Sequence, residues 1–230
     1  MKYIFAGDSW ALKGFTEQNH NQGNSVPLPG DVRLADHWHW PHQLALAPGQ
    51  GNLAVLRQIL KLQPRPDTPI VWVWTEPGRD YAELYPDQDP HNWMRSEHIW
   101  SLRKDLEHAT IKIIQQTIPN PIAFIGGLSD FESPDCTVLE PSWQRWIADQ
   151  LNSKHFVKGW GASDIGWRAV HNSVTPGRAA TFAWDEQIKE WCWWEESGYF
   201  CHEHPSPRAN LEFAQYLQPK VETWLKQYEK

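Results

Sequence analysis

The sequence predicts an α/β protein with three layers, in which a mostly parallel central sheet lies between helices. Short continuous apolar runs, typical of strands buried on both faces, alternate with longer amphipathic segments typical of helices. Strand, helix and strand follow each other repeatedly, and this order favours parallel strands joined by right-handed crossovers. Because the chain contains no linker, repeat or low-complexity tract, we expect a single domain over residues 1–230.

The first predicted strand is the apolar run Tyr3–Ala6, and it leads directly into Gly7, Asp8 and Ser9. Gly7 permits a sharp turn, so Ser9 is expected at the carboxyl end of the strand and near the start of a helix. Backbone N–H groups at a helix start can solvate an oxyanion, which suits a hydroxyl that attacks a carbonyl. Ser9 is therefore the candidate nucleophile, although Asp-Ser is also an ordinary helix N-cap pair.

Residues 11–36 are polar and rich in turn-forming residues, which predicts a functional loop near the site. Asp36 is then expected to cap a helix that extends to about Leu46. Three histidines in this region leave open a zinc site, because histidines at helical spacing can bind metal. Pro41 disturbs that spacing, and we expect no metal. The histidines are His37, His39 and His42.

A short apolar strand beginning at Leu44 is expected to end before Gly49, and an amphipathic helix is expected over Leu53–Leu60. Gly49 and Gly51 would let backbone N–H groups approach a ligand closely, as in anion-binding loops. A plain tight turn accounts for the same two glycines.

The clearest predicted strand is Pro69–Thr75, which is rich in β-branched and aromatic residues. If the strands are parallel, it delivers Thr75, Glu76 and Arg79 to the same sheet edge as Ser9. The Thr75 hydroxyl and the Arg79 guanidinium can donate hydrogen bonds to a developing negative charge, whereas an ionised Glu76 would repel it.

The rest of the chain continues the alternation and then becomes irregular. A long helix is predicted over Asn92–Thr117, followed by a buried strand over Ile122–Gly127. Residues 134–182 are expected to form a loop-like elaboration over the site, with a helix near Ser142–Leu151. A tryptophan-rich helix is expected over Asp185–Glu196.

His204 and Pro205 precede a final helix whose apolar positions run from Leu211 to Leu225. A serine after the first strand and a histidine before the last helix can meet at one edge of a sheet. In this order the two segments resemble those of the SGNH (GDSL) hydrolases. The pattern Trp-Thr-x-x-x-Arg around Thr75 looks like a divergent, phage-type branch of that superfamily.

The resemblance implies an SGNH-hydrolase or flavodoxin-like fold and a serine esterase that needs no cofactor. It implies Ser9 as nucleophile, His204 as base and the N–H groups of Ser9 and Gly49 in an oxyanion hole, with Asn52 alongside. The implied substrate is a small-molecule or glycan ester, such as an O-acyl sugar. The family places an asparagine after the third strand, where this chain has about Glu76, so Thr75 or Arg79 would substitute as donor.

The family also places an acid three residues before the base, and Cys201 occupies that position here. Two interpretations stay open: Ser9 and His204 work as a dyad, or the chain is an SGNH-like binding or structural protein with a tryptophan-lined groove. Sixteen tryptophans make such a groove conceivable, although core packing is the first expectation for most of them. Metal-dependent hydrolysis through Cys201 and its neighbouring histidines is a third, less favoured interpretation.

Composition limits the class of partner. The formal net charge of −7 argues against a general nucleic-acid binder, which normally presents a basic face. The three cysteines are too few for a disulfide framework, and no run approaches a membrane span or a signal-peptide core. We therefore expect a cytoplasmic protein, or a virion-associated one if the chain is phage-encoded. The sequence does not predict the oligomeric state.

Overall fold

The computed structural model describes residues 2–13, 32–75, 77, 79–80, 97–127, 131–143, 146, 182–185, 190–193, 200–201 and 204–229. At 97–104, 182–185, 190–193, 200–201 and 204 it describes the backbone alone.

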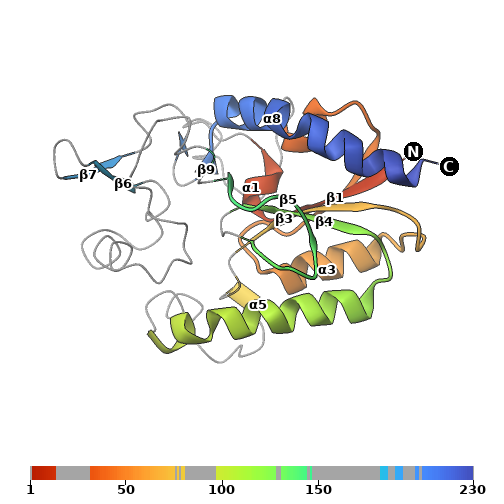
Figure 1. Cartoon of the computed structure of the whole chain (residues 1–230), viewed down its shortest axis with the longest axis horizontal. Coiled ribbons are helices and arrows are strands. Elements are labelled where there is room, and N and C mark those ends of the chain that lie inside the picture. Colours follow the sequence, from red (N-terminus) through yellow and green to blue (C-terminus); the bar gives the residue numbers. More distant parts are fainter. Residues whose placement is uncertain are drawn as a thin grey trace.

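A sheet of five parallel strands forms the centre of the protein, in the spatial order β2-β1-β3-β4-β5 (Figure 1). This order is common among doubly wound α/β sheets. The predicted three-layer α/β fold is therefore confirmed. The strands are β1 (Tyr3–Gly7), β2 (His42–Leu46), β3 (Ile70–Trp74), β4 (Ile122–Gly126) and β5 (Thr137–Glu140).

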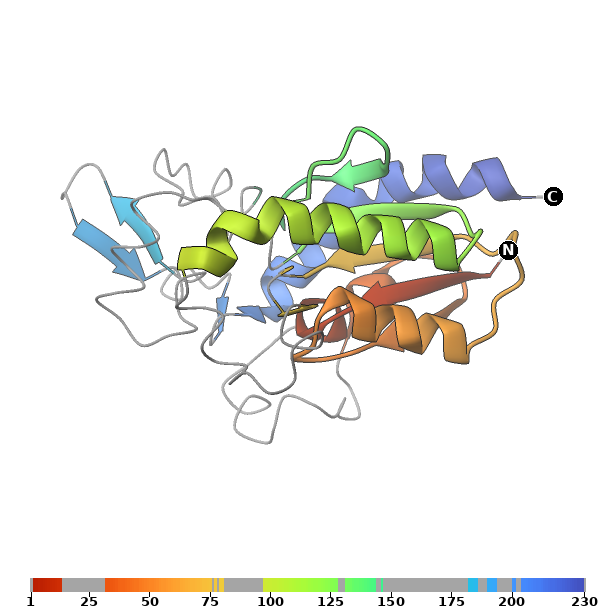
Figure 2. The same ribbon diagram turned by 90° about the horizontal axis from the view of Figure 1, so that it is seen from below.

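Helices cover both faces of the sheet. The long C-terminal helix α8 and the short η1 lie on one face, and α3 and α5 lie on the other, as Figures 1 and 2 show. The predicted helices near residues 53–60, 92–117 and 211–225 are confirmed over the residues that the structure describes. The helical elements are α1 (Ser9–Leu12), η1 (Leu34–His37), α3 (Asn52–Lys61), α5 (Glu97–Thr117), α8 (Pro207–Leu225) and η5 (Lys226–Tyr228).

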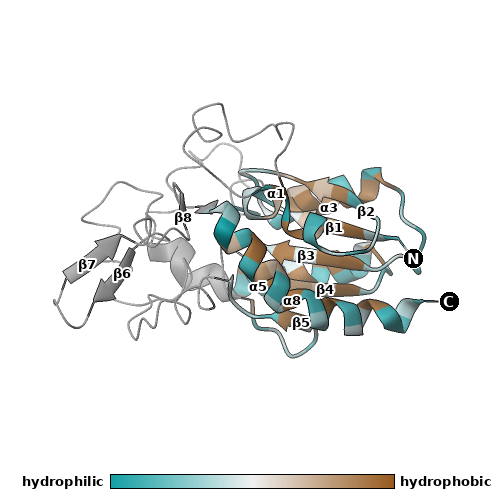
Figure 3. Ribbon diagram, turned by 90° about the horizontal axis from the view of Figure 1, so that it is seen from above, coloured by the Kyte–Doolittle hydropathy of each residue, from teal (hydrophilic) through white to brown (hydrophobic). Residues whose placement is uncertain are grey.

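The apolar runs of the strands supply both halves of the core (Figure 3). In β1, Tyr3 and Phe5 pack in the cluster under α8, whereas Ile4 and Ala6 pack in the cluster under α3 and α5. Successive side chains of a strand point to opposite faces, so a strand that is buried on both faces must be apolar throughout. All five residues of β1 and all five of β3 are buried.

Helix α8 begins where the sequence gives a clear start signal. The Ser206 side chain accepts a hydrogen bond from the Ala209 N–H at 3.2 Å, and Pro207 occupies the first helical position. The sheet-facing stripe of α8 includes Phe213, which stacks on Trp143 with ring centroids 4.4 Å apart. This stripe anchors the last helix to the sheet.

The predicted helix from Asp36 to Leu46 is wrong. The short η1 ends at His37, and β2 begins at His42 and pairs with β1. Pro41 has no N–H for a helix and biases the residue before it towards extended backbone. The Asp36 carboxylate accepts from the Arg33 N–H at 2.8 Å, so Asp36 caps the start of η1 from its third position instead of starting a new helix.

The predicted helix over Asp185–Glu196 is also wrong. Residues Phe182–Asp185 (β6) and Glu190–Trp193 (β7) form an antiparallel pair. Aromatic side chains favour strands, and this preference outweighs the helical spacing that the sequence suggests. Two further short strands, β8 (Phe200–Cys201) and β9 (His204–Pro205), pair with each other before α8.

The elaborations predicted at 11–36 and 134–182 are described only in part. Strand β5 was not predicted and lies within the second of them. Trp143 and Trp146 are helical, while most of the helix predicted over Ser142–Leu151 lies outside the described residues. In the part of the chain that the structure describes, no helix combines the length and apolarity needed to cross a membrane.

The stacked pair on α8 gives a first prediction. Replacing the buried Phe213 by alanine should lower the free energy of unfolding by about 3–5 kcal/mol, because it removes the ring and leaves a cavity against Trp143. Leu211, which is 41% exposed on the same helix, is the control, and Leu211→Ala should cost less than about 1 kcal/mol. Urea unfolding measures both. Equal losses would contradict this account of the core.

Candidate functional site

The carboxyl ends of the parallel strands meet at one edge of the sheet. Gly7 of β1 pairs with Leu46 of β2, and Trp74 of β3 pairs with Gly126 of β4, so the segments that follow these strands emerge together. The chain passes from β1 to β2 on one side of the sheet and from β3 to β4 on the other side. The junction between β1 and β3 is therefore the topological switch point. Open α/β sheets bind ligands in the crevice at such a point.

Ser9 is the first residue of α1, directly after β1, as predicted. Asp8 is the N-cap, and its Oδ1 accepts from the Trp10 N–H at 2.9 Å. The turn needs a glycine, because a Cβ on Gly7 would lie 2.6 Å from the Cβ of Ala11. Ser9 is 4% exposed.

The second carboxylate oxygen of Asp8 connects β1 to the end of β3. Its Oδ2 accepts from the Thr75 hydroxyl at 2.6 Å and from Arg79 Nη1 at 3.0 Å. Asp8 and Thr75 are fully buried, while the Arg79 side chain is 20% exposed. The predicted site residues Thr75 and Arg79 thus lie at the same edge as Ser9, and both are held by the residue before it.

Burial dominates the ionisation of Asp8. Removal from water raises the pKa of this carboxyl group above its ordinary value, and the Arg79 charge, the Thr75 hydroxyl and the Trp10 N–H oppose the rise. These three donors stabilise the carboxylate form.

Asn52, a predicted site residue, has a structural task in this arrangement. Its Oδ1 accepts from the Thr75 N–H at 3.2 Å and its Nδ2 donates to the Thr75 carbonyl at 3.1 Å. Asn52 is fully buried, and these two bonds hold the end of β3 in place. The side-chain amide of Asn52 thereby gives the Thr75 backbone the two hydrogen bonds that a neighbouring strand would otherwise provide.

Asp80 is a second buried carboxylate that the sequence analysis missed. It accepts from the Leu53 N–H at 2.8 Å, from Asn52 Nδ2 at 3.3 Å and from the Thr110 hydroxyl at 3.4 Å, and so joins α3, the end of β3 and α5. A Cβ on Gly51 would collide with the Asp80 carboxylate, which explains the glycine there. The sequence offers one indication of this role: Asp80 directly follows Arg79, which is itself a predicted site residue.

Gly49 lies in the exposed turn between β2 and α3. Its φ of +71° is in the left-handed region that favours glycine, and a Cβ there would meet no atom within 4 Å. Within the described residues, the Gly49 N–H donates to no backbone carbonyl. Glu76 lies outside the described residues.

His204 belongs to the short strand β9, whose backbone approaches the helix that begins at Ser9. Cα atoms of α1 and β9 come within 8 Å of each other, and Figure 1 shows the two elements beside each other. Strand β9 leads directly into α8, which packs on the sheet next to β1. The fold therefore brings together two segments from opposite ends of the sequence.

His37, His39 and His42 belong to no described group of side chains that could hold a metal ion. His42 Nε2 lies 3.1 Å from Asp36 Oδ1, and burial lowers the pKa of His37. Among the residues that the structure describes, no group of three or more histidine, cysteine, aspartate or glutamate side chains could hold a metal ion. His202 and Glu203 lie outside those residues.

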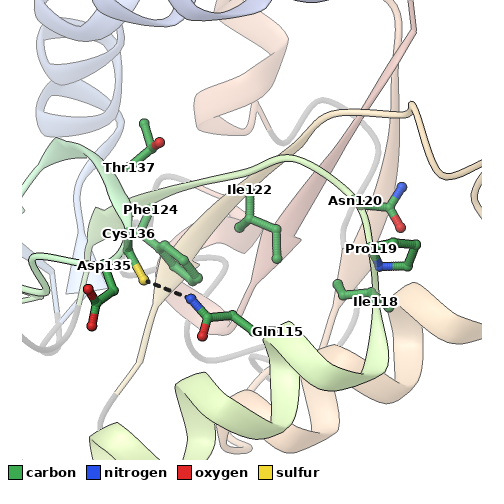
Figure 4. A pocket seen from close by; sticks show the side chains of 9 residues that line it. All are labelled: Gln115, Ile118, Pro119, Asn120, Ile122, Phe124, Asp135, Cys136 and Thr137. Carbon is green, nitrogen blue, oxygen red and sulfur yellow. Dashed lines mark hydrogen bonds between the residues drawn. The ribbon is translucent and has the colours of Figure 1, made fainter.

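A separate pocket of about 290 Å³ lies between α5 and the starts of β4 and β5 (Figure 4). Ile118, Ile122 and Phe124 give it an apolar floor, and Gln115 Nε2 donates to Cys136 Sγ at 3.9 Å. Burial raises the pKa of the Cys136 thiol. Because it adjoins the amino ends of its strands, this pocket is at the opposite edge from Ser9.

Comparison with protein-family models, curated proteins and solved structures found no match. The function is therefore inferred from the residues at the edge of this chain's own sheet.

The raised pKa of Asp8 gives a prediction about stability. As pH rises through the ordinary value of 3.8, the unfolded chain releases this proton before the folded protein does. Wild type should therefore lose stability relative to Asp8→Asn as pH rises above about 4. Urea unfolding at several pH values measures the difference.

The control for this experiment is Asp67→Asn, which breaks an exposed ion pair with Arg65. It should change the free energy of unfolding by less than about 1 kcal/mol throughout. A wild type that gains stability relative to Asp8→Asn as pH rises would show that the folded protein lowers the pKa of Asp8.

Proposed function

We propose that this protein is a serine-dependent ester hydrolase in which Ser9 is the nucleophile and His204 is the general base. The observation that carries the proposal is the approach of α1 and β9 at the carboxyl edge of the sheet. Nucleophilic catalysis by serine needs a base within hydrogen-bond reach. This neighbourhood lies next to the β1–β3 switch point, the place where open α/β sheets bind ligands.

The first step of the proposed reaction forms an acyl-enzyme. His204 takes the Ser9 hydroxyl proton while Ser9 Oγ bonds to the ester carbonyl carbon, giving a tetrahedral oxyanion. The carbon–oxygen bond to the alcohol then breaks, and His204 returns the proton to the leaving alcohol. A water molecule repeats the sequence on the acyl-enzyme and releases the carboxylic acid and free Ser9.

The oxyanion requires hydrogen-bond donors that are in place before the reaction. The N–H groups of Ser9 and Gly49 are the backbone donors of the proposal. Thr75 is a weaker candidate, because its single hydroxyl proton is directed at Asp8. Arg79 has five N–H donors, and among the described residues only its Nη1 is engaged, by Asp8 and Thr75, so Arg79 is the preferred side-chain donor.

The proposed substrate is a small-molecule or glycan ester. The net charge of −7 does not favour nucleic acid, and the absence of a required cofactor follows from the proposed chemistry. We place the protein in the cytoplasm, or in a virion if it is phage-encoded. Most tryptophans whose side chains the structure describes are core residues: Trp10, Trp38, Trp72, Trp74, Trp143, Trp146 and Trp224 are buried.

Labelling with a fluorophosphonate tests the activated serine. The probe should add once to wild type with loss of fluoride, seen by intact-mass spectrometry, and should add to neither Ser9→Ala nor His204→Ala. Circular dichroism would show that both variants remain folded. Ser142, a fully buried serine on another segment, supplies the control variant Ser142→Ala, which should still be labelled. An unlabelled wild type would contradict the proposed function.

A further inference from the structure

Arg79 is the accessible member of the hydrogen-bond network at the sheet edge. Its side chain is 20% exposed, whereas Asp8, Asn52, Thr75 and Asp80 are fully buried. A solute that reaches this edge can therefore touch the guanidinium but none of the four side chains behind it.

One nitrogen of Arg79 is fixed and the other two are not engaged by the described residues. Nη1 lies 3.0 Å from Asp8 Oδ2 and 3.4 Å from Thr75 Oγ1. In the described part of the chain, Nε and Nη2 have no hydrogen-bond partner. A guanidinium is planar, so anchoring one nitrogen restricts where the remaining N–H groups point.

Asp8 ties this guanidinium to the backbone around the nucleophile. Its Oδ1 accepts from the Trp10 N–H at 2.9 Å, while its Oδ2 holds Arg79. Asp8 and Trp10 flank Ser9 on both sides in the sequence. The position of Arg79 is therefore set relative to Ser9 by one carboxylate, which has no freedom to reach solvent because it is fully buried.

We propose that Asp8 is a positioning residue that holds Arg79 so that the free N–H groups of its guanidinium stabilise the oxyanion formed at Ser9. This inference rests on the proposed hydrolase function and assigns the side-chain donor of that same site. The charge of Asp8 balances that of Arg79 before the reaction, so an uncharged ester binds without strong attraction to the pair. The benefit arises as negative charge develops in the transition state.

Turnover of p-nitrophenyl acetate by wild type, Arg79→Ala, Arg79→Lys and Asp8→Asn tests the inference. Arg79→Ala should lower kcat about 10²–10³-fold with little change in KM, because it removes a donor used in the transition state. Guanidinium chloride at low, non-denaturing concentration should restore part of the activity of Arg79→Ala. Arg79→Lys keeps the positive charge but lacks the planar, forked set of N–H donors of a guanidinium. Its kcat should therefore be lower than that of wild type.

Asp8→Asn should also lower kcat, and added guanidinium should not restore it, because Arg79 is still present but no longer held. In this variant, the dependence of kcat on pH at the acidic end should differ from that of wild type. Arg65→Ala removes an arginine whose side chain is 81% exposed and far from the network, and it should keep wild-type kcat.

The outcomes separate the inference from the hydrolase proposal. A wild type without fluorophosphonate labelling or turnover overturns the proposed function itself. An active wild type with an equally active Arg79→Ala overturns the role of Arg79 and leaves Ser9 in place. A folded Arg79→Ala that loses kcat without recovery in guanidinium, or an Asp8→Asn with wild-type kcat and pH profile, overturns the positioning role.

Discussion

The buried carboxylate of Asp8 is the interaction on which the arrangement of the candidate site depends. A charged group without exposure to water is costly unless donors surround it, and the described donors to Asp8 include Thr75, Arg79 and the Trp10 N–H. Removing any of these donors leaves part of that cost uncompensated. The sheet edge around Ser9 therefore has one favourable arrangement, in which the end of β3 is fastened to the start of α1.

The neighbouring network extends this constraint to the helices on one face of the sheet. Asn52 holds the backbone of Thr75, and Asp80 joins the start of α3 to Thr110 of α5. One buried carboxylate thus fixes the turn before Ser9, and the other fixes the segment after β3 that contains Arg79. A rigid edge of this kind suits a site whose donors must be in place before charge develops.

Much of the fold could be predicted because local sequence determines it. Continuous apolar runs identified β1, β3 and β4, and the apolar spacing identified α3, α5 and α8. The errors came from segments where local preferences conflict, as in the helix expected over Asp36–Leu46 and in the tryptophan-rich β6–β7 pair, whereas the strand expected from Leu44 coincides with the second half of β2. The location of Ser9, Thr75 and Arg79 followed from parallel strands. The hydrogen bonds of Thr75 and Arg79 did not, because their acceptor Asp8 becomes buried only when distant segments pack together.

A double-mutant cycle across Asp8 and Arg79 tests the central interaction most directly. The free energies of unfolding of wild type, Asp8→Asn, Arg79→Gln and the double variant give the coupling between the two side chains. If Asp8 holds Arg79 as described, the coupling energy should be about 1–3 kcal/mol at neutral pH, with each single variant losing most of the stability that the double variant loses. Additive effects within about 0.5 kcal/mol would show that the two side chains do not depend on each other.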